Sequence, residues 1–70
     1  MQNSYTAVTK HEGDWWIGWV EEVPGVNCQE RTHDELMETL RMTLREALEF
    51  NRHDALQAAT AGYQEEAVTL

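Results

Sequence analysis

Three histidines and one cysteine are the side chains of this sequence that could bind a transition metal or act as a nucleophile. His11, His33 and His53 are spread along the chain, and Cys28 is its only cysteine. Zinc sites draw on His and Cys pairs a few residues apart, which this spacing does not offer. A nucleophilic cysteine needs an activating base, and nothing nearby supplies one. We therefore expect no metal, no cofactor and no catalytic thiol, so the protein is predicted not to be an enzyme.

Carboxylates are the other chemically active group. Thirteen Asp and Glu residues face five Lys and Arg residues, for a formal net charge of −8 at pH 7. Because proteins hold nucleic-acid phosphates with Lys and Arg, we expect no direct nucleic-acid binding. An acidic surface attracts a basic partner, although the same charge would also serve simply to keep a small domain in solution. Glu21, Glu22 and Glu30 surround the central turn and are the candidate contacts to such a partner.

Three tryptophans lie in the segment Trp15–Val20, which reads WWIGWV. In a strand, alternate side chains point to opposite faces, with Trp15, Ile17 and Trp19 on one and Trp16, Gly18 and Val20 on the other. A helix can cover one apolar face, which leaves the second for another subunit or a partner. Stacking of the tryptophans on single-stranded nucleic acid would need a basic groove beside them. We disfavour this role because Lys10 is the only cation expected near them. Trp16 is therefore a candidate partner contact.

Length and composition limit the chain to one domain, residues 1–70, with a core at 5–50 and an extension at 51–70. A single cysteine rules out an internal disulfide, and small domains without such cross-links often oligomerise, so we expect a dimer or tetramer. No apolar run is long enough to span a bilayer. The first ten residues lack the features of a signal peptide, which together with the free thiol predicts a cytoplasmic protein.

The elements that must position these residues are three strands and a helix. We predict strands at Tyr5–Lys10, Trp15–Val20 and Val26–Glu30, the first two joined by a polar turn that contains Gly13. Pro24 and Gly25 form a dipeptide typical of a type II turn. The predicted fold is α+β, with a three-stranded antiparallel sheet packed in two layers on one main helix.

A capping box begins the helix, with Thr32 three residues before Glu35. Glu35 is expected to reach back to the backbone amide of Thr32. An apolar stripe at intervals of three and four residues follows, comprising Leu36, Leu40, Leu44, Ala47 and Leu48. The helix either ends near Asn51–Asp54 or restarts there and runs to Gly62 at its C′ position. A fourth strand at Ala67–Leu70 would complete a β-β-β-α-β order, whereas a helical tail would give β-β-β-α-α.

Four segments together match the pattern of a known family. A strand opens on a tyrosine, a second strand runs into an acidic turn that contains Pro and Gly, a Thr cap precedes acidic residues, and a helix carries the letters EAL. The matching segments are Tyr5–Val8, Trp16–Val26, Thr32–Leu36 and Glu46–Leu48. In these features the chain resembles the HicB-like antitoxins, whose domain is a partial ribonuclease-H-like fold. Two residues depart from the pattern, because Glu21 replaces a proline and Glu30 stands where a glycine is usual.

The resemblance implies an antitoxin that binds and occludes a small basic ribonuclease toxin of the HicA-like kind. Longer members carry a DNA-binding domain, which these 70 residues leave no room for, so operator binding is not implied. Nuclease activity of the domain itself is disfavoured because the first strand offers no carboxylate for two-metal chemistry. The alternative is an orphan HicB-like domain that serves as a homo-oligomeric interaction or scaffold protein.

Overall fold

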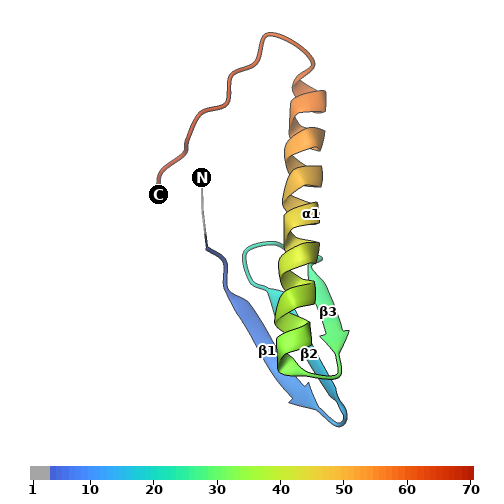
Figure 1. Cartoon of the computed structure of the whole chain (residues 1–70). Helices are drawn as coiled ribbons and strands as arrows, with labels where there is room; N and C mark the ends of the chain where they lie inside the picture. The colour runs from blue at the N-terminus through green and yellow to red at the C-terminus, as the bar shows by residue number, and fades with distance from the viewer. Residues whose placement is uncertain (1–3) are drawn as a thin grey trace.

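The computed structural model describes residues 4–70, which form three strands followed by one long helix. The elements are β1 (Ala7–Glu12), β2 (Trp15–Val20), β3 (Asn27–Glu30) and α1 (His33–Ala59). The strands form one antiparallel sheet in the order β1-β2-β3. Figure 1 shows α1 lying across one face of this sheet and continuing beyond it. The predicted α+β fold, a three-stranded antiparallel sheet packed on one helix, is confirmed.

A tight hairpin joins β1 to β2. Glu12 pairs with Trp15, so the loop contains only Gly13 and Asp14. Gly13 has φ +62°, the positive value that the first central residue of a type II′ turn requires. Because such a turn needs only two residues, β1 continues to Glu12, two residues past the predicted end at Lys10. Its start also moves, from Tyr5 to Ala7.

The connection from β2 to β3 contains the predicted type II turn. The Val26 amide donates to the Val23 carbonyl over 3.3 Å, and Gly25 has φ +94°. Because the Val26 carbonyl accepts from the Val20 amide, the chain is already paired here, although β3 begins at Asn27 and not at Val26 as predicted.

A small core lies between the sheet and the helix. Its buried side chains are Val20, Val23, Val26, Leu36 and Leu40. The helix lies close to the sheet over Gly18, where a Cβ atom would lie 3.0 Å from Leu40 Cδ1 and 3.1 Å from Leu36 Cδ2. The absence of a side chain at Gly18 therefore sets the distance between the two layers.

The capping box forms in part. Thr32 caps α1, and its Oγ1 accepts from the Glu35 amide over 3.1 Å, as the spacing predicts. The Glu35 carboxylate, however, accepts from the Thr32 hydroxyl over 2.9 Å and not from the Thr32 backbone amide. One hydroxyl thus serves both as acceptor and as donor, so the second expected bond is replaced by a side-chain pair.

The helix runs without a break through Asn51–Asp54 to Ala59, a length of 27 residues. No Gly or Pro interrupts this stretch, so neither the predicted stop nor the restart occurs. The C-cap is Thr60 with φ 64°, so Gly62 is not the C′ residue. Residues 60–70 form no helix or strand, and the fourth strand predicted at Ala67–Leu70 is absent from the described chain.

Half of the helix lies beyond the sheet. At about 1.5 Å per residue α1 is about 40 Å long, whereas a six-residue strand spans about 20 Å. The molecule is accordingly elongated, with a longest extent of 51 Å (Figure 1). Within residues 4–70, no helix combines the length and apolar character that crossing a membrane requires.

Candidate functional site

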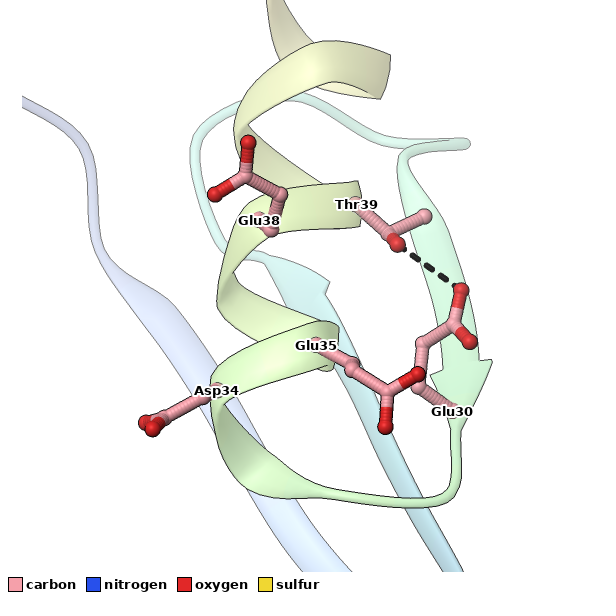
Figure 2. Close-up of a pocket in the computed structure, with 5 residues that line it drawn as sticks. All are labelled: Glu30, Asp34, Glu35, Glu38 and Thr39. Carbon is pink, nitrogen blue, oxygen red and sulfur yellow. Dashed lines mark hydrogen bonds between the residues drawn. The ribbon is translucent and has the colours of Figure 1, made fainter.

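An acidic surface lies where β3 meets the first two turns of α1. The residues that line it are Glu30, Asp34, Glu35, Glu38 and Thr39. Figure 2 shows Glu30 and Glu35 pointing into the space between β3 and the helix, whereas Asp34 and Glu38 extend from the far side of the helix. We call these five residues the acidic surface.

Hydrogen bonds hold part of the acidic surface in place. The Glu30 carboxylate accepts from the Thr39 hydroxyl over 2.7 Å, a bond that joins the end of β3 to α1 (Figure 2). Glu35 is fixed by its two bonds to Thr32 at the start of the helix. Both carboxylates are therefore oriented before any partner arrives, which lowers the entropic cost of binding.

The charge of the acidic surface is largely unpaired within the described chain. The ion pairs found among residues 4–70 join Lys10 to Glu12, His33 to Asp34 and Arg52 to Glu65. None of them includes Glu30, Glu35 or Glu38. Among the same residues, no group of three or more His, Cys, Asp or Glu side chains is arranged to hold a metal ion. The chemistry that this surface offers is attraction of cationic groups.

The structure separates the acidic residues predicted to act together. Glu30 pairs with Trp16 near the start of β2, whereas Glu21 and Glu22 follow the end of that strand. Five residues at about 3.4 Å each place Glu21 about 17 Å from Trp16 along the strand. Glu30 thus belongs to the acidic surface, and Glu21 and Glu22 belong to the opposite end of the sheet.

Glu22 is engaged in holding the start of the chain. Its Oε1 accepts from the Thr6 amide over 2.8 Å, and its Oε2 accepts from the Thr6 hydroxyl over 2.7 Å. The bond from the Thr6 backbone amide has the larger effect and the bond from the hydroxyl the smaller, and both lower the pKa of Glu22 below its ordinary value of 4.5. Binding a partner through this carboxylate would compete with both bonds, so the first role that the structure gives Glu22 is to position Thr6.

Trp16 lies on the sheet face that the helix covers. Its ring stacks on His11 with centroids 4.6 Å apart, and His33 meets it edge-on at 5.1 Å. The alternation of side chains predicted which residues share a face, but not which face the helix would choose. Because α1 packs over Gly18, Trp16 is half-buried beneath the first turn of the helix.

The opposite face of the sheet has no helix over it in the described chain. We call it the open face, and it carries Val8, Lys10, Glu12, Trp15, Ile17, Trp19, Asn27 and Gln29. Trp15 and Trp19 keep 37% and 41% of their surface exposed. Arg31, whose guanidinium lies 4.1 Å from the centre of the Trp15 ring, was missed by the sequence reasoning. Glu30 pairs with Trp16, so continuing the β2–β3 pairing by one residue places Arg31 opposite Trp15.

Cys28 lies beneath the helix. It is half-buried, and its Sγ lies 3.4 Å from the Thr43 hydroxyl. Of the three histidines, His11 and His33 both contact Trp16, whereas His53 lies on the exposed end of α1.

Comparison with known proteins finds no match. No protein-family model, no curated protein and no solved structure is significantly similar to this chain. The described chain itself offers two candidate binding surfaces, the acidic surface and the aromatic open face.

Proposed function

We propose that this protein acts by binding, as an antitoxin of the HicB-like type that occludes a small basic ribonuclease. The observation that carries the proposal is the acidic surface, where Glu30, Glu35 and Glu38 have no cationic partner among residues 4–70. The net charge of −8 adds a long-range attraction for a basic protein.

A ribonuclease binds the phosphates of its substrate with Lys and Arg side chains. Carboxylates presented on a folded surface offer the same cations an alternative set of negative groups, so the antitoxin would compete directly with RNA. Because Glu35 and Glu38 are exposed and Glu30 is only half-buried, the attraction is screened by salt and acts chiefly on the association rate. A complex of this kind should weaken as ionic strength rises.

The direct test uses the product of a small basic reading frame beside this gene, co-expressed with the full chain. We expect a stoichiometric complex in which RNA cleavage is suppressed. Failure to isolate a complex with any such product, or a complex that still cleaves RNA at the free rate, would refute the antitoxin proposal.

A charge-reversal pair locates the binding surface. Glu38→Lys should weaken the complex at least about tenfold and reduce its dependence on salt, since a like charge then faces the partner. Glu46→Lys is the matched control, because Glu46 is also exposed on α1 but lies about 12 Å further along it at about 1.5 Å per residue. Equal losses in both variants would assign the effect to net charge and not to the acidic surface.

The second candidate function is a homo-oligomeric interaction or scaffold domain. The open face favours it, because two half-exposed tryptophans on an uncovered sheet are a common feature of interfaces. A chain that self-associates and captures no basic partner in the same co-expression would support this alternative.

A further inference from the structure

The open face differs from the rest of this acidic molecule in its charge. Glu12 is the one acidic residue at an open-face position of the three strands, out of thirteen in the sequence. Lys10 lies beside it, and Arg31 covers Trp15, so two of the five Lys and Arg residues border this face. Counted one residue beyond the strands, which adds Glu21 as well as Arg31, the open face holds two acidic and two basic residues. It therefore carries no excess of negative charge, whereas the acidic surface does.

The chain also buries little apolar surface for its length. Five side chains form the buried core of the described residues. Domains of this size seldom reach ordinary stability from a single small core and commonly gain it by associating. The largest apolar groups left uncovered on the sheet are Trp15 and Trp19, which a partner could bury.

We propose that a second copy of this chain covers the open face, so that two sheets pack face to face with Trp15, Ile17 and Trp19 at the centre. One patch used by both copies satisfies the geometry of a twofold dimer. Two chains of charge −8 repel, and the open face is where their approach is opposed least. A basic partner would meet Lys10 and Arg31 at this face and is better placed on the acidic surface.

The size of the open face sets the expected strength of the dimer. Strands about 20 Å long spaced about 4.8 Å apart give a flat area of about 300 Å² per copy. Two copies contribute about 600 Å² of flat area, which is below the roughly 1,200–2,000 Å² buried in a standard interface. We therefore expect a reversible dimer with a micromolar dissociation constant.

Sedimentation equilibrium of the full chain tests this proposal. The expected result is a monomer–dimer equilibrium that tightens as salt is raised, because salt screens the repulsion between the copies. The tryptophan emission should shift to shorter wavelength as the dimer forms, since Trp15 and Trp19 leave water. A chain that stays monomeric over the micromolar to millimolar range would overturn the proposal.

A matched pair of variants locates the contact. Trp19→Lys should weaken association at least about tenfold, since it places two charges at the centre of the contact. Phe50→Lys makes the same kind of change on α1, where Phe50 is 69% exposed, and should leave association unchanged. Circular dichroism of both variants checks that the fold is retained.

Other outcomes would assign the open face differently. Association that survives Trp19→Lys would overturn the proposal. Quenching of the tryptophans by a single-stranded RNA oligomer, without dimerisation, would also overturn it and indicate stacking on bases. The two proposals can be refuted independently, because rising salt should weaken the toxin complex and strengthen the dimer.

Discussion

Replacing Gly18 by Ala probes the contact that sets the spacing of the two layers. An added Cβ would lie 3.0 Å from Leu40 Cδ1, 3.1 Å from Leu36 Cδ2 and 3.2 Å from the Val8 carbonyl oxygen. The two carbon–carbon distances are shorter than the roughly 3.5–4.0 Å at which carbon atoms attract best. Because both leucines are buried, neither side chain can simply turn into solvent.

Two opposing terms give the magnitude. Forcing one extra carbon into a packed core costs about 1–3 kcal/mol. Replacing Gly in a strand by Ala recovers about 0.5–1 kcal/mol of conformational entropy. The net expectation is a loss of about 1 kcal/mol, and Gly18→Val, with two further carbons, should lose more.

Urea unfolding at one fixed protein concentration measures this loss, since any self-association shifts apparent stability. With a slope of about 1 kcal/mol per molar for so small a domain, the midpoint should fall by about 1 M. Leu40→Val in the same chain shortens one of the crowded side chains, so the double variant should show a favourable coupling of at least about 0.5 kcal/mol. A Gly18→Ala protein as stable as the original would refute the close approach of helix and sheet.

Three further predictions concern the ends of the elements. Thr32→Ala should lower the free energy of unfolding by about 1 kcal/mol in denaturant titrations, because the Glu35 amide loses its cap. A lowered pKa stabilises the fold above the unfolded pKa, so the contribution of Glu22 should be lost as pH falls below about 4.5. Glu22→Gln should remove this part of the acid dependence, and Thr6→Val, which loses the hydroxyl bond but keeps the amide bond, should reduce it. An unchanged pH profile in the Glu22→Gln protein would contradict the assignment. Backbone amides of residues 50–59 should exchange with solvent faster than those of the packed half of α1, since that end of the helix lies beyond the sheet.

The local patterns of the sequence predicted most of the fold. Alternation in Trp15–Val20, the Pro24–Gly25 turn and the Thr32 cap depend on a few neighbouring residues, and each appears in the structure. The ends of β1 and β3 shifted by one or two residues because pairing and turn length, not propensity, decide where a ladder stops.

Features that depend on distant contacts could not be read from the chain. A strand at Ala67–Leu70 needs an edge to pair with, and a helix that continues to Ala59 leaves the tail away from the sheet. The acidic surface joins Glu30 to helix residues through packing, so its membership becomes visible only with the fold in hand. Likewise, the sequence did not show that the helix covers Trp16, because this depends on Leu36 and Leu40 packing against Gly18 on the same face of the sheet.

Because α1 covers only one face of the sheet, the two proposed binding surfaces lie on opposite sides of the chain. The acidic surface lies on the helix side, and the open face points the opposite way. Two copies joined through their open faces would therefore present two acidic surfaces outward, in opposite directions. Such a pair could hold two basic proteins at once without crowding, or bind more tightly to a partner that is itself paired, because a second contact within one assembly is favoured by its high effective concentration.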